Sequence, residues 1–174
     1  MPSGPAFHSW LAALFEQSEM DIRRLIDDET ALQFLIAWSI FEAKCFSGFV
    51  KAAQIAGYAK RASPSVCQES ISDAVAHFHA RYQDESLFRH LMHRQDNTRL
   101  SGLIGHKLSD LTDEDRVFFL VFVIYRFRNN IFHGNKGVET WLRYREQIQY
   151  CIGAMQVLIT HAEQAAPSIR AEAA

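Results

Sequence analysis

Glycine and proline are scarce in this chain, which has 174 residues but only 8 glycines and 4 prolines. Sheet proteins with many strands need these residues at their turns, so the scarcity argues against a β-sandwich or barrel and favours helices. Hydrophobic residues make up 48% of the chain and charged residues 22%, which is typical of a folded domain and unlike a disordered segment. A chain of this length fits one domain, which can bury roughly 70% of its unfolded surface.

Cysteine is also scarce. Cys45, Cys67 and Cys151 are odd in number and far apart, so they form neither a disulfide framework nor a CxxC metal pair. We expect them to be small core residues in a reducing compartment. The N-terminus lacks the charged and apolar regions of a signal peptide, and no apolar run is long enough to cross a bilayer. These features predict a cytoplasmic protein with no membrane partner.

Strong positive charge is absent as well, because the formal net charge is −2 and the pI is near 6.4. A protein that coats nucleic acid needs a broad basic face, so only a local basic site is expected here. Phosphate-loop, dinucleotide-binding, GxSxG and HExxH signatures are missing too. His90 and His93 could share a helix face, but no carboxylate or cysteine completes a metal site, so we expect no metal and no cofactor.

Apolar periodicity predicts an all-α, single-domain bundle of about four long helices with short peripheral helices. The domain spans residues 1–174, with frayed tails at 1–6 and 167–174. Residues 93–107 are polar and contain glycine, which favours a long surface loop. Ser63 or Ser65 should cap a helix that has Pro64 in its first turn. The short link before the last helix should make the last two helices antiparallel neighbours. The expected helical stretches are 7–17, 22–26, 29–60, 65–82, 87–92, 113–133 and 138–163.

The stretch from Arg126 to Gly137 stands apart from the rest of the sequence. It follows eight consecutive apolar residues, Val117 to Ile124, and combines two arginines, two asparagines and a histidine before a glycine stop. A helix that is apolar all round is buried, so its polar end is expected to reach a site. A plainer interpretation is that these cations and amides close a helix C-terminus.

Glu42 is a carboxylate on an otherwise apolar helix face, which it shares with Leu35, Trp38, Cys45 and Phe46. Such a group must reach water or find a partner. We therefore expect it either at a boundary or paired with an arginine of the stretch 126–137, in a supporting role.

Within this stretch, Arg128-Asn129-Asn130-Ile131-Phe132-His133 resembles the signature of the HEPN superfamily. That signature is an arginine, usually followed by a polar residue, and then a histidine after four to six intervening residues. The position late in the penultimate long helix of an all-α chain also fits. The resemblance covers residues 29–163, although about ten residues carry it. Asn135 stands where one subgroup has a tyrosine, so the tyrosine-modification mechanism of that subgroup is not carried over.

The resemblance implies a homodimer with a composite cleft that cleaves RNA without a metal, as a toxin or phage-defence effector with an antitoxin or regulatory partner. Histidine, with a typical pKa near ~6.5, suits proton transfer, and arginine suits phosphate. The alternative is a non-catalytic HEPN module that binds RNA or a protein. The candidate residues are Arg128, His133 and Asn129 as catalytic, Arg126, Asn130, Asn135 and Lys136 as substrate-binding, and Glu42 as structural support.

Helix geometry leaves the choice of arginine open. Positions 128 and 133 lie about 140° apart around a straight helix, whereas position 126 falls on the same side as 133. Either the helix unwinds before Gly134, or both arginines share the work, or Arg128 is bound to Glu42 inside the fold. Asn129 directly after Arg128 favours Arg128 over Arg126 as the functional residue.

Overall fold

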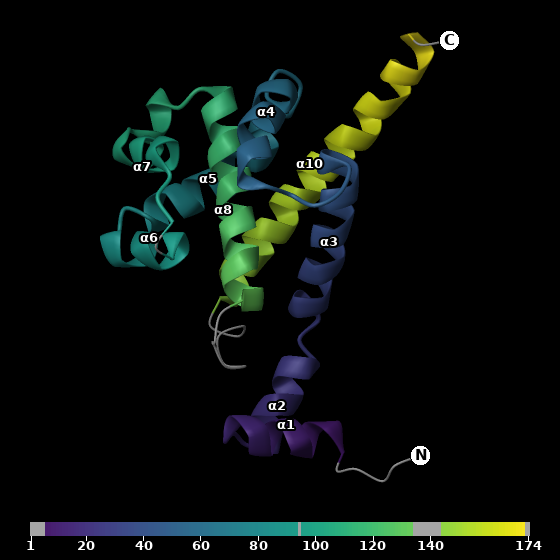
Figure 1. Cartoon of the computed structure of the whole chain (residues 1–174), viewed down its shortest axis with the longest axis vertical. Coiled ribbons are helices and arrows are strands. Elements are labelled where there is room, and N and C mark those ends of the chain that lie inside the picture. The colour runs from purple at the N-terminus through teal and green to yellow at the C-terminus, as the bar shows by residue number, and fades with distance from the viewer. Residues whose placement is uncertain (1–5, 94, 134–143, 173–174) are drawn as a thin grey trace.

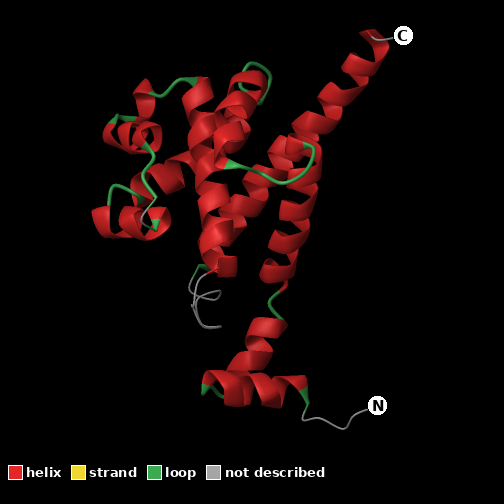
Figure 2. Ribbon diagram, viewed as in Figure 1, coloured by secondary structure: helices red, strands yellow, loops and turns green. Residues whose placement is uncertain are grey.

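A computed structural model describes residues 6–93, 95–133 and 144–172. All regular structure in these ranges is helical, which confirms the all-α prediction (Figure 2). None of the helices described is both long enough and apolar enough to cross a membrane. The elements are α1 (Phe7–Phe15), α2 (Glu19–Ile26), α3 (Glu29–Phe46), α4 (Ala52–Ala62), α5 (Gln68–Arg81), α6 (Glu85–Met92), α7 (Thr98–Gly105), the 3-10 turn η1 (Leu108–Asp110), α8 (Asp113–His133) and α10 (Arg145–Glu172).

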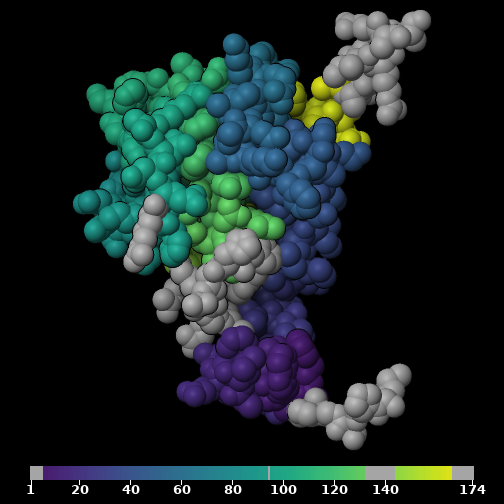
Figure 3. Space-filling model, viewed as in Figure 1, coloured from purple at the N-terminus to yellow at the C-terminus, as the bar shows by residue number. Residues whose placement is uncertain are grey.

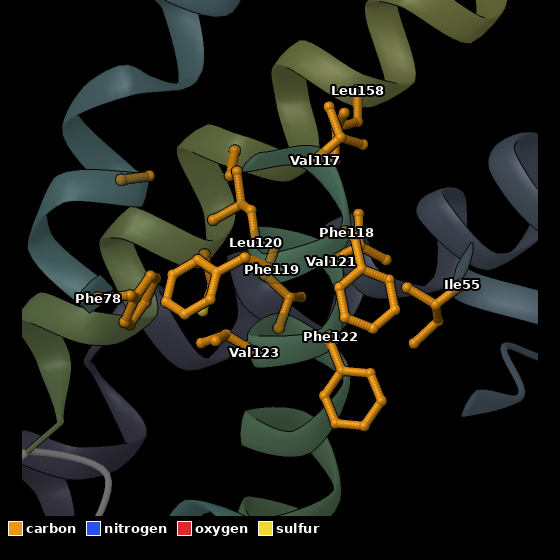
Figure 4. Packing of buried hydrophobic residues seen from close by; sticks show 14 of the residues in the cluster. Ile55, Phe78, Val117, Phe118, Phe119, Leu120, Val121, Phe122, Val123 and Leu158 are labelled. Carbon is orange, nitrogen blue, oxygen red and sulfur yellow. The ribbon is translucent and has the colours of Figure 1, made fainter. Parts of the chain in front are cut away.

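The centre of the fold is α8, whose bounds match the predicted helix. Thr112 precedes it, and its hydroxyl accepts a hydrogen bond from the Asp115 amide at 3.2 Å. The next two turns, residues 117–124, are buried on every side (Figure 4). This is possible because α4 and α5 pack along α8, and α6 and α7 cover more of it. The burial of residues 117–124 therefore fixes the position of the polar C-terminal turns of α8 at the edge of the core.

α3 and α10 run parallel, and an ion pair joins them near each end. Arg145 lies 3.7 Å from Asp28 at the lower end, and Lys44 lies 2.8 Å from Glu163 at the upper end (Figure 1). α10 lies mainly along α3 and α5, whereas α8 lies mainly along α4 and α5. The last two helices run in opposite directions, as predicted, but each makes its main contacts with other helices (Figure 1). α10 also continues to Glu172, through the segment predicted as a frayed tail.

The predicted helical stretch 29–60 is two helices. α3 ends at Phe46, because Ser47 adopts a left-handed conformation with φ of 56° and Gly48 follows with φ of 140°. The second value lies in a region that side chains disfavour, so glycine suits this turn. The apolar periodicity continues across the turn, which is why sequence reasoning missed the break.

The predicted loop 93–107 is also wrong, because it contains α7. The Asn97 side chain accepts a hydrogen bond from the Leu100 amide at 2.8 Å and so caps this helix. Leu100, Leu103 and Ile104 are buried against the body. Three apolar residues among polar ones were too few to show a helical period. Nor does a serine cap α5: Cys67 occupies the N-cap position.

α1 and α2 form an arm that lies beyond the lower end of α3 (Figure 1). The two helices pack against each other. Asp28 caps α3 through the Thr30 amide at 2.9 Å, directly after the arm. We refer to residues 7–26 as the arm.

The three cysteines should differ sharply in reactivity. Burial raises the pKa of Cys45 to about 11 and that of Cys151 further, whereas the hydrogen bond with the Ser70 side chain lowers the pKa of the exposed Cys67. The thiolate is the reactive form. We expect one thiol per folded chain to react rapidly with Ellman's reagent at pH 8, and three in denaturant. Rapid labelling of a folded Cys67→Ser variant would contradict the burial of the other two.

Candidate functional site

The last two turns of α8 present side chains toward two different neighbours. Arg126 and Asn130 contact the C-terminal end of α6, whereas Arg128 contacts α3. This division follows from helical spacing, since residues four apart share a face and residues two apart do not. The predicted site residues are thus held on both sides of one helix.

Arg126 is a buried arginine, with only 4% of its surface exposed. Its Nε donates to the Leu91 carbonyl at 3.2 Å, its Nη2 to the Met92 carbonyl at 2.6 Å and its Nη1 to the Gln95 side-chain oxygen at 2.6 Å. Burial lowers the pKa of Arg126, but a guanidinium remains charged at neutral pH. The cation therefore satisfies carbonyls at the end of α6, where the helix dipole is negative.

Asn130 performs the same task one turn later. Its amide nitrogen donates to the Leu91 carbonyl at 2.9 Å and to the His90 carbonyl at 3.2 Å. α6 ends at Met92 and His93 follows in a left-handed conformation, so the last carbonyls of α6 have no further helical turn to bond. The contacts account for Arg126 and Asn130 as residues that join α6 to α8, and they give no support to the prediction that either binds substrate.

Arg128 lies on the other side of α8 and is only partly buried. Its Nη1 donates to the Asn129 side-chain oxygen at 3.2 Å, and its guanidinium carbon lies 5.5 Å from the centre of the Trp38 ring of α3. Asn129 and the aromatic face thus orient a cation that keeps exposed surface. Of the two candidate arginines, Arg128 is the one that combines orientation with access.

His133 is the last residue of α8, and the helix is continuous up to it. Of the three alternatives for the arginine, unwinding of the helix before Gly134 is therefore not found in α8 as described. Position 133 lies about 140° from position 128 around the axis and about 20° from position 126. The side chain of His133, and all of Asn135 and Lys136, lie outside the residues that the structure describes.

Glu42 accepts a hydrogen bond from the Val50 amide at 3.1 Å. Its backbone carbonyl also accepts from the Gly48 amide at 3.1 Å. Both contacts close the connection between α3 and α4. Glu42 is half-buried at the boundary of the core, and its contacts support a turn.

A small cavity lies between α5, α6 and α8, beside the residues that join α6 to α8. Its volume is about 40 Å³, and its lining includes Arg81, His90, Asn130 and Tyr144. Sites for small molecules are usually ~300–1,000 Å³, so this space cannot enclose a nucleotide. Within the part of the chain that is described, no group of three or more His, Cys, Asp or Glu residues is arranged to hold a metal ion.

The role of α6 was not anticipated from the sequence. The only available signal was the four-residue spacing of Arg126 and Asn130, which places both on one face. Nothing in the sequence indicated that the last carbonyls of α6 face that side. In comparisons with known proteins, no family model, curated protein or solved structure matches this chain.

Proposed function

We propose that this protein is a HEPN-like, metal-independent endoribonuclease in which Arg128 binds the scissile phosphate and His133 transfers protons. The observation that carries the proposal is the orientation and partial exposure of the Arg128 side chain. It is an oriented, partly exposed cation held by Asn129 and Trp38 at the same helix end as His133, whereas Arg126 is fully engaged with α6. An accessible guanidinium suits phosphate because it is planar and always charged.

The proposed reaction needs only groups on the chain and on RNA. His133 accepts the proton of the ribose 2′-hydroxyl, and the 2′-oxygen attacks the adjacent phosphorus. The bond from phosphorus to the 5′-oxygen breaks, and the protonated His133 gives the proton it took from the 2′-hydroxyl to that oxygen. Arg128 stabilises the negative charge on the non-bridging oxygens, and Asn129 fixes its orientation. The products are a 2′,3′-cyclic phosphate and a 5′-hydroxyl.

A second copy of the chain would bring Arg128 and His133 together, although they lie on different sides of α8 within one chain. Because α8 stays helical to its last residue, positions 128 and 133 of one chain lie on different sides of the helix. In a two-fold dimer, Arg128 of one copy can act with His133 of the other, which gives two composite sites. We propose this arrangement rather than a site within one chain.

The experiment is to incubate the purified protein with RNA in EDTA and to identify the product ends. We expect cleavage that leaves 2′,3′-cyclic phosphate and 5′-hydroxyl ends. A substrate with a single 2′-deoxyribose at the cleaved position should resist, because it lacks the attacking oxygen. Cleavage that depends on added metal, or that leaves 5′-phosphate ends, would contradict the mechanism.

The alternative is a non-catalytic helical module that binds a protein partner. The observation that favours it is the exposed apolar surface of the arm and of α3, which suits a protein interface. Absence of cleavage with every RNA tested would favour this alternative over the ribonuclease.

A further inference from the structure

The arm carries large apolar side chains that its own chain leaves uncovered. Six of them are between 39% and 60% exposed. α1 and α2 pack mainly on each other, and in Figure 3 they form the lower end of the described chain. Scattered apolar residues on a surface are ordinary, but six within a twenty-residue arm are not. They are Phe7, Trp10, Leu14, Phe15, Met20 and Ile26.

The outer side of α3 offers a matching surface. Leu32, Leu35, Ile36 and Ile40 are between 41% and 59% exposed. Ile36 and Ile40 also line a shallow groove between α3 and α10, together with Ile152 and Ile159 of α10. The other residues that line the groove are uncharged, so no charge must be desolvated when the groove is covered.

We infer that the arm of a second copy of this chain docks on the outer face of α3, in the groove between α3 and α10. Each copy then donates one arm and offers one groove, and a two-fold axis covers both arms and both grooves at once. The inference does not rest on RNA cleavage.

The exposed area fits this occupant. The ten apolar residues of the arm and α3 together expose on the order of 900 Å². A stable protein interface buries about 800 Å² on each partner. A single chain that contains both halves of such a surface is self-complementary, which a dimer satisfies without a further protein.

The short connection between the arm and the body favours docking of the arm on a second copy over docking on its own chain. Asp27 and Asp28 alone separate α2 from α3, and Asp28 is held by the Thr30 amide and by Arg145. With the start of α3 fixed in this way, the arm extends beyond the end of the helix, away from Ile36 and Ile40 (Figure 1). Short connections of this kind favour the exchange of an element between copies.

The test measures molar mass in solution by light scattering or sedimentation, without RNA. We expect twice the chain mass of 19.9 kDa. An arm variant, Trp10→Glu with Leu14→Glu, and a groove variant, Ile36→Glu with Ile40→Glu, should each raise the dimer dissociation constant at least ~100-fold. A pair at exposed positions of α6, Ser86→Glu with Arg89→Glu, serves as the control and should leave the mass unchanged.

Mixing the arm variant with the groove variant tests whether the arm of one copy binds the groove of the other. In a mixed dimer, the intact arm of the groove variant meets the intact groove of the arm variant, so dimers should reappear at concentrations where each variant alone is monomeric. Failure to recombine would overturn the exchange, as would a monomeric parent protein or a dimer insensitive to both variants. If glutamate unfolds the chain, Trp10→Ser with Leu14→Ser tests the same contact.

Discussion

Alanine at Arg128 or at His133 is expected to lower the rate of RNA cleavage at least ~100-fold while leaving the fold intact. Removal of a donor that stabilises charge in a transition state commonly costs ~100-fold to ~1,000-fold, and loss of a general base or acid costs a similar amount. Because Arg128 is partly exposed whereas Arg126 is buried, loss of Arg128 should cost less folding stability than loss of Arg126. Cleavage rates in EDTA, with melting temperatures measured beside them, check both parts.

A matched control is Arg89→Ala, which removes an exposed cation from α6 and should not change the rate. Arg128→Lys should recover little, because lysine cannot hold two phosphate oxygens in one plane. Equal activity of Arg128→Ala, His133→Ala and the parent protein would refute the proposed roles.

Mixtures of the two inactive variants test whether the site is composite. If Arg128 of one copy works with His133 of the other, a mixed dimer holds one intact site and one that lacks both groups. Mixing should then restore a measurable fraction of the parent rate. If both residues act within one chain, every site in the mixed dimer lacks one group and mixing restores nothing.

The long helices could be predicted from the sequence because each has a local signal. α8 has acidic residues in its first turn and a buried apolar run, and its bounds followed from both. The break after Phe46 could not be predicted, because apolar residues continue at helical spacing on both sides of Ser47 and Gly48. α7 was missed for the opposite reason: its few apolar residues are buried by contact with α8, which only the tertiary structure provides.

The candidate site shows the same limit. Arg126 and Arg128 both fit a spacing in which four to six residues lie between the arginine and the histidine, so in the sequence only Asn129, directly after Arg128, favours one over the other. What separates them is the position of α6, whose terminal carbonyls lie beside Arg126 and not beside Arg128. Contacts between residues about 35 positions apart are set by packing rather than by local pattern, so this distinction required the structure.

Arg126→Ala is expected to destabilise the protein by about 2–4 kcal/mol, which is the largest effect on stability that we predict. The substitution removes three hydrogen bonds, two of them charge-assisted bonds to the buried Leu91 and Met92 carbonyls, which still accept from the Asn130 side chain and the Gln95 amide. Urea unfolding measures the loss, and hydrogen exchange should increase most in α6. Asn130→Ala, which removes a neutral donor to the same helix end, should cost about 1 kcal/mol.

The two arginines should therefore give opposite results in the same pair of assays. Arg126→Ala should lower the unfolding midpoint, and under conditions where the chain remains folded it should keep most of the cleavage rate. Arg128→Ala should keep the midpoint and lose the rate. Arg126→Lys should recover part of the stability, because one ammonium reaches some of the acceptors but cannot span all three. If Arg126→Ala proved as stable as the parent protein and inactive on RNA, Arg126 would be the functional arginine. Its hydrogen bonds to the end of α6 would then not be the reason for an arginine at this position.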